Sequence, residues 1–192
     1  MCGRYYIDDD TAKEIQKLIR DVEERQKIAV KDIRPTEQAP ILYAEKSAIR
    51  CCFQQWGFPG VADNKLIINA RSESAMEKRM FRDGVERRRI VIPAAGFYEW
   101  NVRKEKNTFT RRGHDMMYMA GIYSRFENED RFVILTTSAN ESMAPVHDRM
   151  PLILEKEEVM PWLMEGNRAS EFLHKVPCLL ERSTEYEQMS LF

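Results

Sequence analysis

Four apolar runs rich in β-branched and aromatic residues follow one another between residues 89 and 137, and they constrain the fold more than any other feature. The runs are RIVIPAAGFYEW, TFTRR, DMMYMAGIYS and RFVILTT, and charged or glycine-containing turns separate them. Three further strand-like stretches lie upstream: ILYAE, AIRCCFQQW and KLIINA. The sequence therefore predicts a structure in which antiparallel strands dominate.

Helical patterns lie on either side of these strands. Thr11 and Glu14 have the spacing of a capping box, and an apolar stripe predicts a helix from there to about Gln26. Residues 72–89 also read as helical, with Gly84 as a candidate break, and residues 157–165 and 168–174 read as two short helices. Since neither a repeat nor a long linker occurs, we expect a single α+β domain over residues 1–192, with peripheral helices and a helical, acidic extension over 155–192.

Composition limits the class of protein. Of the 192 residues 43% are hydrophobic and 32% are charged, which is typical of a globular protein and excludes collagen, low-complexity disorder and a coiled-coil rod. No apolar run approaches the roughly 18 residues of a membrane span, and the first residues, MCGRYYIDDD, do not resemble a signal peptide. We therefore expect a cytoplasmic protein without contact to a membrane.

Cysteine and histidine are too scattered to predict a metal centre. The cysteines are Cys2, Cys51, Cys52 and Cys178, and no CxxC pair occurs among them. Adjacent cysteines on a strand point to opposite faces, so Cys51 and Cys52 make a poor pair of ligands. We expect no metal, no cofactor and no disulfide framework.

Charge is unevenly distributed although the net charge is only −1. Basic residues predominate between Arg71 and Arg112, and acidic residues predominate after Glu155. The basic segment is consistent with a local phosphate-binding face and equally with a solvated helix surface.

Cys2 directly follows the initiator methionine, so removal of Met1 would expose a thiol and an α-amine on adjacent carbons. An α-amine has a pKa of about 7.7–8.0, so much of it is neutral near pH 7. This 1,2-aminothiol can condense with an aldehyde, first through the amine to a Schiff base and then through the thiol to a thiazolidine. Alternatively the thiol alone can serve as a nucleophile, or the residue can be an idle thiol at a frayed terminus.

Two strand-like segments carry further candidates. Glu99 is the only charged residue in VIPAAGFYEW, so burial would desolvate it and suit it either to acid–base chemistry or to pairing with an arginine. Asn69 and Arg71 end an apolar strand and share one face, where the amide could orient a reacting group and the guanidinium could hold a phosphate. A strand end followed by a helix cap would account for the same two residues.

The segment APVHDRMP places His147 on a loop between two prolines, where it could be a general acid or base or an ordinary surface histidine. Trp56 and Trp100 could stack on the bases of single-stranded nucleic acid, although core packing is the more common role of a tryptophan.

The four segments MCGRY, NARSE, GFYEW and HDRMP, in this order from the N-terminus, resemble the SOS-response-associated peptidase (SRAP) family. WGF at 56–58, AGIY at 120–123 and FVILTTSAN at 132–140 fit the same resemblance, which extends from Met1 to about Leu154. It implies a twisted, barrel-like sheet and a protein that binds single-stranded DNA at abasic sites. Cys2 would form a thiazolidine crosslink with the open-ring sugar and so protect the lesion, after Met1 has been removed by the protein itself or by a methionine aminopeptidase.

The resemblance also implies roles for the other residues. Asn69 would position the amine or the sugar, Glu99 would transfer protons, and His147 would act on the sugar hydroxyl. Phosphate contacts would come from Arg4, Arg71 and Arg149, and base or wedge contacts from Trp56 and Trp100. Burial of the chain start follows, since Cys2 must reach Glu99 and His147.

Two other functions remain open from sequence alone: a thiol peptidase that acts on other proteins through Cys2, and a non-catalytic nucleic-acid-binding module. We expect a monomer, associated with the nucleoid if the protein is bacterial. The last five residues, Gln188 to Phe192, resemble a sliding-clamp-binding peptide, and a frayed terminus is the simpler interpretation.

Overall fold

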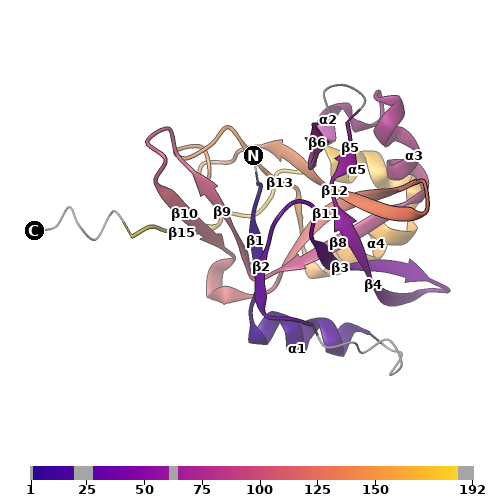
Figure 1. The fold of residues 1–192 in the computed structure, drawn as a ribbon, viewed down its shortest axis with the longest axis horizontal. Helices are drawn as coiled ribbons and strands as arrows, with labels where there is room; N and C mark the ends of the chain where they lie inside the picture. Colours follow the sequence, from indigo (N-terminus) through magenta and orange to yellow (C-terminus); the bar gives the residue numbers. More distant parts are fainter. Residues whose placement is uncertain (1, 20–27, 61–64, 186–192) are drawn as a thin grey trace, which may run out of the picture.

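The computed structural model of the chain describes residues 2–19, 28–60 and 65–185 (Figure 1). The helices are α1 (Asp9–Leu18), α2 (Ser72–Ala75), α3 (Arg79–Arg87), α4 (Val159–Met164) and α5 (Ala169–Leu173), with 3-10 turns η2 (Arg112–His114), η3 (Lys156–Glu158) and η4 (Gly166–Arg168). The strands are β1 (Tyr5–Ile7), β2 (Lys31–Ile33), β3 (Gln38–Glu45), β4 (Ala48–Trp56), β5 (Phe58–Pro59), β6 (Leu66–Ile67), β7 (Asn69–Arg71), β8 (Arg89–Ala94), β9 (Gly96–Trp100), β10 (Lys106–Thr110), β11 (Met117–Phe126), β12 (Glu129–Ser138), β13 (Arg149–Pro151), β14 (Ile153–Leu154) and β15 (Glu181–Ser183). None of the described helices has the length and apolar character needed to cross a bilayer.

Five strands close into a barrel. β12 pairs with β4, β4 with β3, β3 with β8, β8 with β11, and β11 again with β12. The pairing of β12 with β4 is parallel, with Phe132 opposite Trp56, and the other four pairings are antiparallel. The expected α+β class, with a barrel-like and mainly antiparallel sheet and peripheral helices, is confirmed.

A second sheet, in the order β15-β10-β9-β1-β2, continues from the barrel wall. The run RIVIPAAGFYEW supplies both sheets, because the chain bends at Ala95 and passes from β8 into β9. Gly96 permits the bend, since a Cβ there would lie 2.5 Å from the Phe109 carbonyl oxygen and 2.9 Å from the Tyr6 ring. The sequence pattern suggested one strand and could not locate this crossing.

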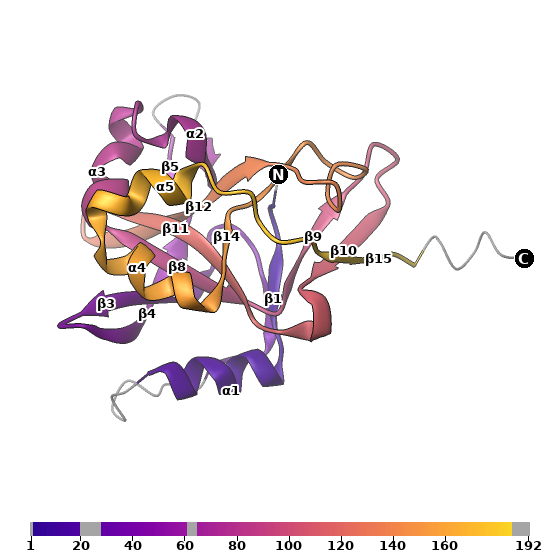
Figure 2. The same ribbon diagram turned by 180° about the vertical axis from the view of Figure 1, so that it is seen from behind.

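The barrel is covered on one side by α4 and α5, which Figure 2 shows from behind. Every residue of β8 is buried, because the barrel interior lies on one face of the strand and α4 packs on the other. Trp162 of α4 donates its Nε1–H to the Ile90 carbonyl over 2.9 Å. Arg89 is buried beside it and donates to carbonyls near the ends of α3 and α4, including those of Val85 and Trp162.

The helices differ from the sequence pattern at their ends. α1 begins at Asp9 and is capped by the Asp8 side chain, which accepts from the Thr11 N–H over 2.8 Å. The predicted helix over 72–89 consists of two helices, with a break between Ala75 and Arg79. Gly84 does not break the helix but lies inside α3, where its Cα packs against the Ile122 side chain. Helices α4 and α5 lie where the pattern predicted them. The end of the first predicted helix (20–26) and the C-terminal peptide (188–192) lie outside the described residues.

The close packing of β11 against the barrel core yields a stability prediction at Gly121. A Cβ there would lie 2.3 Å from Ile92 Cδ1 and 2.8 Å from the Val133 carbonyl oxygen. Gly121→Ala should therefore lower the free energy of unfolding by about 2 kcal/mol through overpacking, measured by urea denaturation. Gly166→Ala is the matched control, because its nearest contacts would be 3.4 Å away. Equal stability of the two variants would contradict the tight barrel closure at Gly121.

Candidate functional site

Cys2, the first of the described residues, is buried, as predicted. Cys2 precedes β1 and is only 1% exposed, and its Sγ–H lies 4.0 Å from the Arg4 carbonyl oxygen as a weak donor. β1 lies between β9 and β2, with Tyr5 opposite both Phe97 and Ile33. Pairing on both edges therefore fixes the position of Cys2.

Asn69 holds the backbone of Cys2 from the barrel side. It is the first residue of β7, which pairs in parallel with β12 so that Asn69 lies opposite Ile134. Its Nδ2–H donates to the Cys2 carbonyl oxygen over 3.0 Å. Its Oδ1 is buried and accepts no hydrogen bond from the described part of the chain, so an acceptor is directed into the site beside Cys2.

Glu99 lies in β9, the neighbour of β1, and is 6% exposed. The burial pattern of β9 places Phe97 and Glu99 on the inner face, while Tyr98 and Trp100 lie on the outer face. Burial raises the pKa of the Cys2 thiol to about 12, and the nearby charge of Glu99 adds to the rise. Cys2 is therefore held as a neutral thiol next to a carboxylate.

His147 lies in space beside Trp100, the last residue of the strand that carries Glu99. It lines a hollow of about 630 Å³ together with Trp100 and Asn101, which directly follow Glu99, and with the turn after β12. Its Nδ1 accepts from the Arg149 N–H over 3.0 Å and lies 2.8 Å from Asp148 Oδ1. The first contact suits an Nδ1 without a proton, and the second suits an Nδ1 that carries one.

The Arg149 side chain is held by contacts within the protein. Its guanidinium donates to both carboxylate oxygens of Glu73, over 2.6 and 2.9 Å, and to the Thr136 carbonyl over 2.6 Å. This buried arginine joins β13 to the start of α2 and orients the backbone N–H that contacts His147. A phosphate contact from Arg149 stays a prediction, and it would have to compete with Glu73.

Arg4 and Arg71 differ in their surroundings. Arg4 forms an ion pair with Asp32, and its guanidinium lies 5.3 Å from the centre of the Tyr98 ring. Burial and the hydrogen bond that Tyr98 donates to Asp32 raise the pKa of the Tyr98 hydroxyl to about 12. Arg71 is exposed at the end of β7 and pairs with no carboxylate of the described residues.

Trp56 and Trp100 differ in their exposure to solvent. Trp56 is 0% exposed, donates its Nε1–H to the Ile68 carbonyl over 2.9 Å and packs between Tyr5 and Phe132. A ring without exposed surface offers no face to a base, which corrects the expectation that Trp56 stacks on DNA. Trp100 is 37% exposed beside His147, so its ring is accessible.

The structure thus brings Cys2, Asn69 and Glu99 together and places His147 at the adjoining strand end. Sequence reasoning missed Asp32 and Glu73, the carboxylates that engage Arg4 and Arg149. Glu73 stands two residues after Arg71 in NARSE, so its closeness to the site could have been inferred. Its partner, 76 residues away, could not.

The sequence matches the family profile of the SOS response associated peptidase (SRAP) over residues 1–191. It is 29% identical to the abasic site processing protein YoqW of Bacillus subtilis, over 92% of this chain and 86% of that protein. It is 27% identical to the abasic site processing protein YedK of Escherichia coli, over 89% and 84% of the two chains. The fold is similar to a crystal structure of a Bordetella bronchiseptica protein, with a TM-score of 0.78, 22% identity, and 95% and 99% of the two chains covered.

The raised pKa of Cys2 predicts its alkylation kinetics. A shift from 9.0 to about 12 lowers the thiolate fraction at pH 8 about a thousandfold relative to the unfolded chain. Carbamidomethylation of Cys2 by iodoacetamide, followed by peptide mass spectrometry, should therefore be slow in the native protein and rise about tenfold per pH unit up to about pH 12. In urea the rate should level off above pH 9. A native rate that levels off at pH 9 as well would contradict the buried thiol.

The Arg149–Glu73 contact predicts a cost for neutralising the carboxylate. Glu73→Gln leaves the buried guanidinium without its charged partner and should lower the free energy of unfolding by about 2 kcal/mol in urea denaturation. Glu77→Gln, at an exposed position one turn further on, is the matched control and should leave stability unchanged. A loss of stability of the same size in both variants would show that the ion pair is not its cause.

Proposed function

This chain belongs to the SOS response associated peptidase family, and we propose that it binds single-stranded DNA at abasic sites and crosslinks itself to the lesion through Cys2. The relatives named above are abasic site processing proteins, which supports processing of this lesion. The observation that carries the proposal is the burial of Cys2 between the amide of Asn69 and the carboxylate of Glu99. An idle terminal cysteine requires none of these neighbours.

The chemistry begins with hydrolysis of the Met1–Cys2 peptide bond, which consumes one water and frees the α-amine of Cys2. The amine attacks C1′ of the open-ring abasic sugar, and loss of one water gives a Schiff base. The Cys2 sulfur then adds to the carbon of the C=N bond while its proton passes to the nitrogen. The product is a thiazolidine, which accounts for every atom of the aminothiol and the aldehyde apart from the expelled water.

The neutral state of the thiol fits this order of steps. With a pKa of about 12 the sulfur keeps its proton while the amine attacks, so the amine reacts first. Glu99 is the buried carboxylate beside Cys2, and we assign it the transfer of protons from the amine and to the departing water. Asn69 holds the Cys2 carbonyl, and its buried Oδ1 can accept from the newly freed amine.

His147 serves the sugar in this proposal. The Arg149 N–H and the Asp148 carboxylate hold its Nδ1, and we assign the imidazole the transfer of a proton to or from the ring oxygen of the sugar. The hollow beside it offers space for the lesion next to the exposed ring of Trp100, which can stack on a neighbouring base. Arg71 is the exposed cation best placed to hold a flanking phosphate, because Arg4 and Arg149 already contact carboxylates.

The rival function, a thiol peptidase acting on other proteins, fits this site less well. A nucleophilic cysteine works as a thiolate, and its surroundings normally lower its pKa. Here burial and Glu99 raise the pKa of Cys2. A non-catalytic nucleic-acid-binding module would explain neither the buried carboxylate nor the fixed chain start.

The decisive experiment mixes the purified protein with a single-stranded oligonucleotide that carries one abasic site. We expect a band that survives denaturing electrophoresis, and an intact mass equal to protein plus DNA less Met1 and one water. Cys2→Ala should reduce the adduct more than a hundredfold, because the amine alone gives only a reversible Schiff base.

Cys52→Ala is the matched control, since this partly exposed cysteine lies in β4 and should not affect the adduct. The same oligonucleotide with an intact base should give no adduct. Wild-type levels of a stable adduct from Cys2→Ala would contradict the mechanism. Absence of any adduct from a chain shown by mass to lack Met1 would contradict the function.

A further inference from the structure

The outer face of the second sheet carries a lysine that is held on an aromatic ring beside the hollow of His147. Lys106, the first residue of β10, lies opposite Trp100 of β9, so the two side chains are on the same face of the sheet. The Lys106 ammonium lies over the ring of Tyr98, with Nζ 3.9 Å from the ring centre. A cation–π contact therefore holds the ammonium group of the residue that directly neighbours the exposed Trp100.

The support of this ammonium group is itself fixed. Tyr6 stacks on Tyr98 with their ring centres 5.2 Å apart, and the Tyr98 hydroxyl donates to Asp32 over 3.1 Å. The hydroxyl of Thr184 donates to the Lys106 carbonyl over 3.0 Å. A free surface lysine loses much rotamer freedom when it binds a ligand, and these contacts restrict that freedom beforehand. Lys106 is thus better prepared to bind an anion than an ordinary surface lysine.

The charge of Lys106 remains available to a ligand. The neighbouring Arg4 is compensated by its ion pair with Asp32. Lys106 contributes to the field at Asp32, but it forms no ion pair with this or any other carboxylate in the described part of the chain. Glu185 lines the same small hollow of about 230 Å³ and does not pair with it either.

The turn that joins β9 to β10 adds to this positive charge. It carries Arg103 and Lys104, both exposed, and the single carboxylate of Glu105, which accepts from Asn101 Nδ2 over 2.6 Å. Asn101 also lines the hollow of His147, so the basic turn borders the space that the proposed function assigns to the lesion.

The arrangement selects a nucleotide strand as the ligand. An exposed aromatic ring stacks on a base, and a cation beside it meets the phosphate of the same strand. Figure 1 shows the chain start between the hairpin of β9 and β10 on one side and α2, which directly follows Arg71, on the other. Exposed cations therefore lie on both sides of Cys2.

We propose that Lys106 binds a phosphate of the DNA strand, namely that of the nucleotide whose base stacks on Trp100 next to the lesion. The inference rests on the proposed function and adds the course of the strand, which runs from Arg71 past Cys2 to the hairpin of β9 and β10. Tyr98 is a positioning residue, because it holds the ammonium group and does not itself contact the DNA.

Fluorescence anisotropy of the full chain tests this contact, with a single-stranded oligonucleotide that carries a tetrahydrofuran abasic analogue. The analogue has no aldehyde form, so binding stays reversible. Lys106→Gln should weaken binding about fivefold at low salt and reduce the slope of log K against log salt by about 0.7, the value for one phosphate of a single strand. Lys106→Arg should restore both, since it returns the charge.

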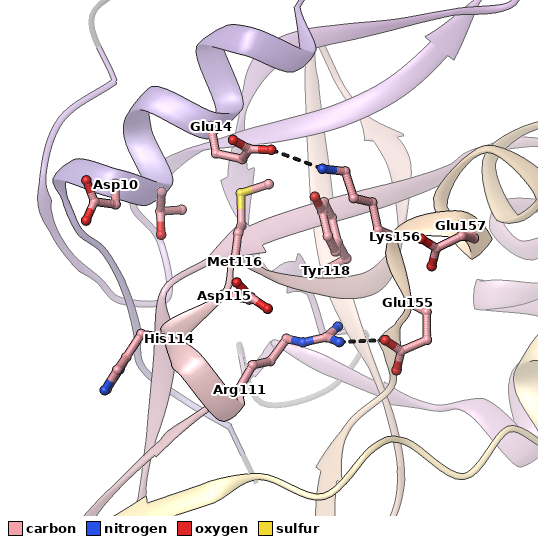
Figure 3. Close-up of a pocket in the computed structure, with 11 residues that line it drawn as sticks. Asp10, Glu14, Arg111, His114, Asp115, Met116, Tyr118, Glu155, Lys156 and Glu157 are labelled. Carbon is pink, nitrogen blue, oxygen red and sulfur yellow. Dashed lines mark hydrogen bonds and ion pairs between the residues drawn. The ribbon is translucent and has the colours of Figure 1, made fainter.

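Lys156→Gln is the matched control, because it removes the same charge elsewhere. Figure 3 shows its ammonium group paired with Glu14 of α1 over 3.3 Å, and Figure 1 places α1 at the end of β1 opposite the chain start. This variant should bind with the affinity and the salt dependence of the wild type. A loss as large as that of Lys106→Gln would assign the effect to net charge and overturn the inference.

Oligonucleotides in which one phosphate at a time is a neutral methylphosphonate locate the contact. At one position beside the lesion, this replacement should weaken wild-type binding about fivefold and have no further effect on Lys106→Gln. Additive losses at every position, or wild-type affinity of Lys106→Gln, would overturn the inference. Crosslinking of the wild type to the authentic abasic oligonucleotide, measured in parallel, tests the proposed function independently of these results.

Discussion

The register of β1 is the constraint on which the site depends. This strand has three residues, and one face of it points into the core while the other faces the outer side of the second sheet. Tyr5 packs 5.3 Å from Trp56 on the inner side, and Tyr6 stacks 5.2 Å from Tyr98 on the outer side. A slip of one residue would exchange these two faces and leave both rings without partners. The aromatic contacts therefore fix where Cys2 emerges, next to Glu99.

Burial of so many polar groups around one residue costs free energy, and the structure offsets it with specific contacts. The Asn69 amide satisfies the carbonyl of Cys2, and Glu73 neutralises Arg149. The same desolvation makes the Cys2 thiol a weak acid, which a thiolate enzyme could not tolerate. For the crosslinking reaction that we propose it is an advantage, since in that reaction the amine attacks first and the thiol is needed only to close the ring.

Much of the fold and of the site could be predicted, for reasons that particular residues illustrate. The apolar run around Glu99 correctly predicted its burial, and the family resemblance correctly predicted that Asn69 lies beside Cys2. Alternation identifies a face but not the partner on that face. The contact of Arg149 with Glu73 spans 76 residues, and the core position of Trp56 depends on barrel closure, so neither follows from local pattern.

The two ends of β1 have different electrostatic characters, and this difference bears on how DNA could approach. The exposed Arg71 lies near the Cys2 end, whereas five carboxylates, several of them in ion pairs, line a hollow beside α1. A chain with a net charge of −1 cannot attract a phosphate backbone as a whole, so attraction must be local. In the proposed function, the carboxylates at the far end repel this backbone and so favour its approach to the end that carries Cys2. Within the proposal, the exposed Arg71 is therefore a local cation on which an almost neutral protein relies to draw DNA toward Cys2.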